Sequence, residues 1–103
     1  MPNKRYQKGR RWEWKVKEKW EREGFLVYRS AGSKGAADLI AIKDGQAYLI
    51  QVQVSNRPSR AKALRLLDEA LMYGAIPVMV VWNGKKRQLS EIFLTDAETF
   101  NLN

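Results

Sequence analysis

The order of hydrophobic and polar residues predicts two amphipathic helices. In residues 9–23, apolar side chains recur every four positions at Trp12, Val16 and Trp20, which is the spacing of one buried helix face. Residues 60–73 show a second helical pattern. Its buried side is expected to consist of Ala63, Leu64, Leu67, Ala70 and Leu71. Its exposed side is expected to carry Arg60, Lys62, Arg65 and Glu69.

Five shorter segments have the composition of strands: residues 25–29, 38–42, 48–54, 76–82 and 88–94. Tight turns are predicted at Asp44-Gly45 and Asn83-Gly84, two pairs that favour hairpin loops. The order αβββαββ predicts an α/β fold in which a mixed β-sheet is flanked by helices. We expect a single domain over residues 1–103, with a basic N-terminal arm over about residues 1–8.

Two glutamines interrupt the apolar strand at residues 48–54. Because side chains alternate along a strand, Gln51 and Gln53 share one face with Leu49. The opposite face carries Tyr48, Ile50, Val52 and Val54. Asp38 begins the preceding strand in an Ala-Ala-Asp-Leu-Ile context, where a carboxylate needs polar partners. These three polar residues predict a small polar site in an apolar sheet, although the glutamines could also serve only to hydrogen-bond across it.

Composition narrows the chemistry that this site can perform. The 103 residues include no cysteine and no histidine, which excludes disulfides, thiolate zinc sites and a histidine general base. Catalysis would have to rely on carboxylates, lysine, amides or a metal bound by oxygen. No apolar run approaches the roughly 20 residues that span a bilayer, and no signal-peptide core follows the N-terminus. We therefore expect a soluble, cytoplasmic protein without membrane association.

The charge balance points to a polyanionic partner. The chain has 19 basic and 11 acidic residues, a net charge of +8, and a sequence pI near 10.0. So basic a small domain most often binds nucleic acid, although a surface rich in Lys, Arg and Glu is also typical of thermophilic or ribosome-associated proteins. Residues 1–23 carry most of the excess. Their basic cluster suits phosphate contacts better than base reading.

The loop at residues 30–35 combines small residues with Ser30, Ser33 and Lys34. A phosphate could approach such a backbone closely. The loop lacks the Gly-Lys-Ser/Thr order and the following helix of a P-loop. Taken alone, it is more typical of a plain connection.

Several short segments together resemble the archaeal-type Holliday-junction resolvases, within the PD-(D/E)xK nuclease superfamily. They are Lys8-Gly9 before a helix with Glu13, then Gly24-Phe25, Arg29 to Ser33 before Asp38-Leu39, Gln51 to Val54, and Gly74 to Val78. They occur in the family's order over about residues 6–94. The resemblance implies a restriction-endonuclease-like fold and a hydrolase that cuts branched DNA, such as four-way junctions, during recombination and repair.

The resemblance also implies roles for individual residues. Glu13 and Asp38 occupy positions where the family binds a divalent metal, Mg²⁺ or Mn²⁺. Gln51 stands where the family has a glutamate ligand, and Gln53 where it has the lysine that positions the attacking water. Without the resemblance, Glu13 would be one more charge on a solvated helix face. Contacts to DNA are implied for Lys8, Arg10, Arg11, Arg29, Ser30, Ser33 and Lys34.

The two glutamines leave the activity open. Gln51 can offer only a neutral oxygen, and Gln53 has no positive charge, a loss that typically costs on the order of hundredfold or more in rate. A Gln–Gln pair nevertheless fills the volume of a Glu–Lys pair without a buried unpaired charge. The chain could still cut through Glu13, Asp38, an amide ligand and water. Alternatively, it binds DNA without cutting, was engineered to be inactive, or serves as a repair scaffold.

A homodimer is implied as well, because two equivalent sites suit symmetric cleavage of a four-way junction. Apolar side chains expected to be exposed are candidates for the subunit contact. They are Trp14, Met79, Trp82 and Phe93.

Overall fold

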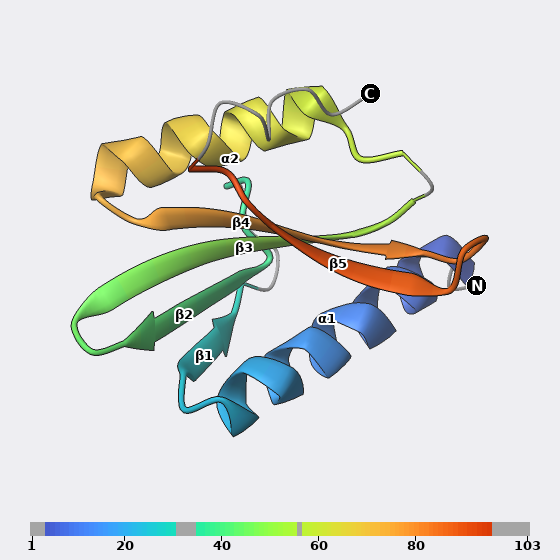
Figure 1. Cartoon of the computed structure of the whole chain (residues 1–103), viewed down its shortest axis with the longest axis horizontal. Coiled ribbons are helices and arrows are strands. Elements are labelled where there is room, and N and C mark those ends of the chain that lie inside the picture. The colour runs from blue at the N-terminus through green and yellow to red at the C-terminus, as the bar shows by residue number, and fades with distance from the viewer. Residues whose placement is uncertain (1–3, 31–34, 56, 96–103) are drawn as a thin grey trace.

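The computed structural model of the chain describes residues 4–30, 35–55 and 57–95. Within them, helices and strands follow the predicted order αβββαββ. The elements are α1 (Lys4–Arg22), β1 (Leu26–Arg29), β2 (Leu39–Lys43), β3 (Gln46–Val54), α2 (Arg60–Tyr73), β4 (Ile76–Asn83) and β5 (Gln88–Phe93). Figure 1 shows one sheet lying between α2 and α1. No helix in the described residues is both long and apolar enough to cross a bilayer.

The strands are arranged in their sequence order, β1-β2-β3-β4-β5. β3 and β4 are parallel, and the other neighbouring pairs are antiparallel. Parallel neighbours require a crossover, and α2 provides it on one face of the sheet. α1 contacts β1, β2 and β3 on the other face. Coverage on both faces explains why β4 is apolar over nearly its whole length.

The hairpin of β2 and β3 sets the register around the predicted site. Asp44 and Gly45 have φ angles of 52° and 77°, and positive φ at both central residues is typical of a type I′ turn. The resulting register pairs Leu39 with Ile50. Asp38 therefore enters the sheet beside the part of β3 that carries the two glutamines.

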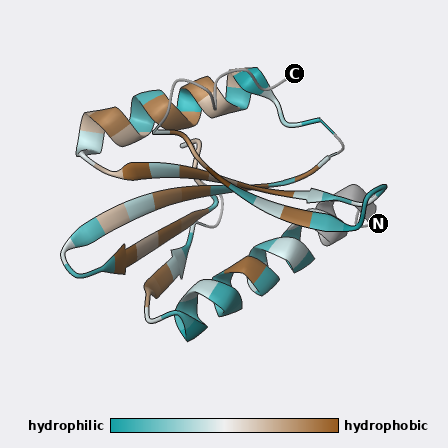
Figure 2. Cartoon of the chain, in the orientation of Figure 1, coloured by the Kyte–Doolittle hydropathy of each residue, from teal (hydrophilic) through white to brown (hydrophobic). Residues whose placement is uncertain are grey.

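Two apolar cores lie on the two faces of the sheet. The α1-side core consists of Val16, Trp20, Val27, Leu39, Ala41, Ile50, Val78 and Val80. The α2-side core consists of Ala36, Ala37, Leu49, Ala63, Leu66, Ala70, Met79, Val81 and Leu94. In Figure 2, hydrophobic colours gather on the strands, whereas α1 is largely hydrophilic. The predicted alternation along β3 is confirmed, since Ile50 belongs to one core and Leu49 to the other.

The buried face of α2 differs from the prediction. Ala63 and Ala70 are buried as expected, but the large residue between them is Leu66. Leu64 and Leu71, predicted to be buried, are 39% and 71% exposed. The helix packs on the sheet through its small residues, and the intervening turn then directs Leu66 inward and turns Leu64 and Leu71 about 100° away.

α1 begins at Lys4, five residues before the predicted start. Part of the expected N-terminal arm is therefore helical, because its Lys, Arg and Gln residues favour a helix and Gly9 lowers its stability by only about 1 kcal/mol. On the predicted stripe, Val16 and Trp20 are buried and Trp12 is half-buried. The turn between β4 and β5 also differs: it takes in residues 84–87, where two residues were expected.

The candidates for a subunit contact divide into two groups. Met79 is fully buried in the α2-side core, because it lies on the central strand β4, so its predicted exposure is wrong. Trp82 is half-buried and stacks on Trp12, with ring centroids 4.3 Å apart. Trp14 and Phe93 are 45% and 41% exposed. Those two side chains remain candidates for the contact.

Candidate functional site

Asp38 lies immediately before β2, at the point where pairing between β2 and β3 ends. Its backbone N–H donates to the carbonyl of Ile50, and its carbonyl accepts from the N–H of Ser30, both at 2.8 Å. Its Oδ2 accepts a hydrogen bond from the backbone N–H of Val52, also at 2.8 Å. The carboxylate thus accepts from the main chain of β3 where the regular ladder stops, and its position is fixed by the backbone of β1 and β3.

The surroundings of Asp38 disfavour its charged form. Burial raises the pKa of this carboxyl, and the hydrogen bond from Val52 partly offsets that effect. The charge of Glu13 raises the pKa further, while the charges of Lys62 and Arg29 lower it. A half-buried carboxylate with a net raised pKa is stabilised by any cation that comes close. Asp38 is therefore electrostatically suited to a metal ion.

Glu13 reaches the site from α1. Its Oε1 accepts a hydrogen bond from Arg29 Nε on β1 at 3.1 Å, and both side chains are about one-fifth exposed. The Arg29 guanidinium also lies 5.8 Å from the ring centre of Trp14. Arg29 holds Glu13 in place and neutralises part of its charge beside Asp38.

The glutamines form a continuous hydrogen-bonded chain. Gln53 is only 7% exposed, and its Nε2 donates to Gln51 Oε1 at 2.9 Å. Gln51 Nε2 donates to the carbonyl of Ala36 at 3.1 Å. Gln53 Oε1 accepts from the backbone N–H of Ser59, the N-cap of α2, at 3.1 Å. Both amides are thus engaged, and neither brings charge to the site.

Glu69 extends this chain and was not expected to take part. Its Oε2 accepts a hydrogen bond from the N–H of Ala36 at 2.8 Å. A Cβ atom at Gly35 would lie 2.6 Å from Glu69 Oε1, so only glycine allows this close approach. The chain of contacts therefore begins and ends on α2, at Glu69 and at Ser59. The run of small residues before Asp38 was the available sequence signal.

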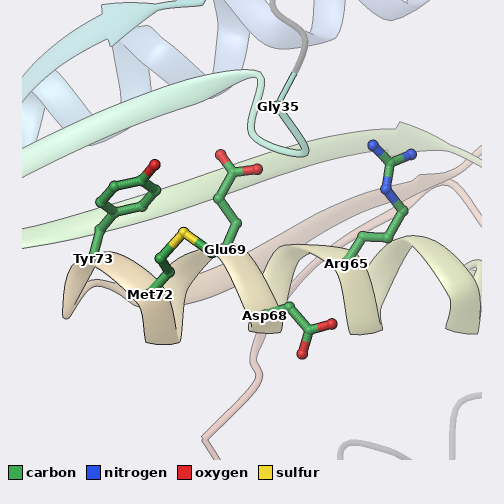
Figure 3. A pocket seen from close by; sticks show the side chains of 6 residues that line it. All are labelled: Gly35, Arg65, Asp68, Glu69, Met72 and Tyr73. Carbon is green, nitrogen blue, oxygen red and sulfur yellow. The ribbon is translucent and has the colours of Figure 1, made fainter.

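A cleft of about 500 Å³ lies beside this contact (Figure 3). Its lining residues are Gly35, Arg65, Asp68, Glu69, Met72 and Tyr73. In Figure 3, Glu69 points toward the Gly35 segment, whereas Asp68 points away from it. Because the Glu69 carboxylate already holds Ala36, the cleft is the outer side of the segment that leads to Asp38. It does not include the carboxylates of the candidate site.

Comparison with known proteins identifies the family. The family model for the archaeal Holliday junction resolvases (Hjc) matches residues 4–98. The chain belongs to this family. The crossover junction endodeoxyribonuclease Hjc of Methanocaldococcus jannaschii is 30% identical over 96 residues, which cover 88% of this chain and 71% of that protein.

A solved resolvase structure supports the fold. The structure of Hjc from Archaeoglobus fulgidus, a Holliday junction resolvase, matches with a TM-score of 0.62 and 23% identity. The match covers 72% of this chain and 63% of that chain. The predicted mixed sheet flanked by helices is thereby confirmed as a resolvase fold.

The structure brings the expected resolvase residues to one end of β2 and β3. Asp38 contacts the backbone on both sides of Gln51, and Gln51 contacts Gln53. Glu13 lies close enough to raise the pKa of Asp38. Their catalytic and metal-binding roles remain predictions.

The expected DNA contacts are less completely described. Arg10 and Arg11 are exposed on α1, Arg29 is hydrogen-bonded to Glu13, and Ser30 to Asp38. Ser33 and Lys34 lie outside the described residues, as does the side chain of Lys8.

The donor set fits a divalent metal in kind but is low in charge. Asp38 and Glu13 offer carboxylate oxygens and Gln51 an amide oxygen, and Mg²⁺ prefers such hard donors. Among the described residues, no group of three or more His, Cys, Asp or Glu could hold a metal ion. A metal here would have two carboxylates and an amide that also accepts from Gln53.

Proposed function

We propose that this chain is a structure-selective DNA endonuclease of the Holliday junction resolvase type, with its metal-dependent centre at Asp38. Family membership supports the substrate, and the relative from M. jannaschii is named as a crossover junction endodeoxyribonuclease. The observation that carries the proposal is the raised pKa of Asp38 beside Glu13, since these two carboxylates lack a sufficient counter-charge. The net charge of +8 supports binding to the DNA backbone.

In this proposal, Asp38, Glu13 and the Gln51 carbonyl hold Mg²⁺ or Mn²⁺. The bound metal would activate water and neutralise charge on the scissile phosphate. The Val52 amide fixes the Asp38 carboxylate, and Arg29 fixes that of Glu13. Neutral amides at positions 51 and 53 make the centre less effective than one with a Glu–Lys pair.

The protein would act as a homodimer, with one centre for each of two opposed strands. Trp14 and Phe93 are the exposed aromatic side chains proposed for the subunit contact. A dimer of so basic a chain would present two cationic surfaces to the arms of a junction.

A second candidate function is binding of junctions without cleavage. It is favoured by the hydrogen bonds that join Gln51 and Gln53 to each other, to Ala36 and to Ser59. This network is complete without a metal ion. In such a protein the resolvase fold would serve recognition alone.

The deciding experiment is cleavage of a labelled four-way junction and a matched linear duplex, with Mg²⁺ or Mn²⁺. The chain should cut the junction, and Asp38→Asn should bind it equally well without cutting. Gln51→Glu/Gln53→Lys should cut on the order of hundredfold faster. If only this double variant cuts, the second candidate is correct. Cleavage by Asp38→Asn at the rate of the unmodified chain would place the centre elsewhere.

A further inference from the structure

Position 53 of β3 lies against the beginning of α2. The Gln53 amide oxygen accepts from the N–H of Ser59 at 3.1 Å. The Ser59 hydroxyl in turn accepts from the N–H of Lys62 at 3.2 Å. Lys62 thus occupies the first turn of α2, one turn from the residue that touches Gln53. Because helical side chains lean toward the N-terminus of their helix, the Lys62 stem leans toward this contact.

The charge of Lys62 acts on Asp38. It lowers the pKa of the Asp38 carboxyl, against the effect of burial, and Arg29 is the other cation that does so. Arg29 is occupied by its bond to Glu13. The Lys62 side chain is exposed, and the structure pairs it with none of the carboxylates that it describes. Lys62 therefore brings an uncommitted positive charge to the side of Asp38.

This position is electrostatically unfavourable for α2 itself. The first turn of the helix holds Arg60 and Lys62 and no acidic residue. Cations there oppose the positive end of the helix dipole. Helix stability therefore does not explain a lysine at position 62, whereas an anion brought to Asp38 would.

We propose that Lys62 supplies from α2 the positive charge that Gln53 cannot supply from β3, and that it contacts the scissile phosphate beside Asp38. This inference rests on the proposed nuclease function. The water oxygen bonds to phosphorus while the bond from phosphorus to the leaving sugar oxygen breaks. The water gives its proton to solvent, and the leaving oxygen takes one from solvent. Lys62 stays protonated throughout and stabilises the charge that develops on the phosphoryl oxygens.

The test compares Lys62→Ala with Arg65→Ala, which removes the same charge one turn further along α2. Both side chains are exposed and alanine favours helices, so both variants should fold. In single-turnover cleavage of a prebound junction with Mn²⁺, Lys62→Ala should be slower by about tenfold or more, and Lys62→Arg should restore most of the rate. Arg65→Ala should cut normally. In a Gln53→Lys background, where β3 carries its own cation, Lys62→Ala should have little effect.

A titration with Mn²⁺ alone gives a readout that needs no cleavage. Removing a cation near the metal should tighten Mn²⁺ binding several-fold in Lys62→Ala and leave it unchanged in Arg65→Ala. If the chain binds no Mn²⁺ in an Asp38-dependent way, the proposed function fails. If it binds Mn²⁺ with the same affinity in Lys62→Ala, only the present inference fails. Equal losses of junction binding in both variants, with unchanged cleavage, would make Lys62 an ordinary phosphate contact and overturn it. A chain that binds Mn²⁺ but does not cut overturns both cleavage and the role of Lys62.

Discussion

The candidate site has a charged half and a neutral half, and the two are stabilised in opposite ways. In the charged half, Asp38 and Glu13 share Arg29 as a close counter-ion, and the pKa of Asp38 is raised. In the neutral half, Gln51 and Gln53 are hydrogen-bonded to each other and to the backbone. The charged half is held by α1, β1 and β2, whereas the neutral half is held by β3 and α2.

The difference shows which half is prepared for a ligand. Within the described residues, no buried side-chain polar atom lacks a hydrogen-bond partner. The neutral half is therefore complete as protein structure. The charged half carries an electrostatic cost that folding alone does not relieve, and a bound cation would relieve it. Metal binding should thus depend on the charged half, and the stability of the fold on the neutral half.

The largest effect is expected from placing a single charge in the neutral half. Gln51→Glu would lose the donor to the Ala36 carbonyl and add a third carboxylate near Asp38 and Glu13. We expect a loss of roughly 2–3 kcal/mol in the free energy of unfolding, measured by urea denaturation without metal. Added Mg²⁺ should restore part of it, because ligand binding to the folded state stabilises that state.

The companion change Gln53→Lys provides the control. Its ammonium would face the new carboxylate at position 51, so Gln51→Glu/Gln53→Lys should be more stable than Gln51→Glu alone. An unchanged urea midpoint for Gln51→Glu, with and without Mg²⁺, would mean that position 51 is not electrostatically coupled to Asp38.

A smaller effect, dependent on pH, is expected from neutralising the charged half. Because the pKa of Asp38 is raised above 3.8, the folded state binds more protons than the unfolded state between that value and the raised one. Stability is therefore lost as pH rises through the raised pKa. Asp38→Asn lacks this loss, so its advantage over the unmodified chain should grow across that interval and then stay constant.

Thermal unfolding over a pH series would measure this advantage. Asp44→Asn, in the β2–β3 turn, also removes one carboxylate but away from the site, and serves as the matched control. An advantage of Asp38→Asn that shrinks with rising pH would contradict a raised pKa. The same series with Mg²⁺ should reduce the advantage, since metal binds the ionised carboxylate.

The two halves also differ in how far the sequence could predict them. Period-two alternation places Gln51 and Gln53 on one face, and the turn at Asp44-Gly45 sets the register; both are local signals. The link from Asp38 to Glu13 rested on resemblance, because a glutamate on a basic helix otherwise looks solvated.

Long-range contacts escaped prediction for a physical reason. Glu69 holds Ala36 across 33 positions of the chain, and a charged residue on a helix gives no sign of which backbone it will meet. The rotation of α2 that buries Leu66 instead of Leu64 also depends on packing against the sheet. Periodicity indicates that a helix has a buried face, but neighbouring elements decide its centre.

The smallest effect is expected where the neutral half returns to α2. In Gly35→Ala, the new Cβ would lie 2.6 Å from Glu69 Oε1, so the carboxylate must move and its hydrogen bond to Ala36 is lost. The loss should be about 1 kcal/mol, the usual net contribution of one hydrogen bond. Glu69→Ala should cost a similar amount, because it removes the same bond without a clash.

A double-mutant cycle by urea denaturation tests this geometry. In Gly35→Ala/Glu69→Ala the methyl group meets no carboxylate, so the double variant should be no less stable than Glu69→Ala alone. Simple addition of the two losses would show that Gly35 and Glu69 act independently. If they do act as one contact, the Ala36 carbonyl keeps its place against Gln51, and the neutral half owes part of its order to a glutamate on the exposed side of a helix.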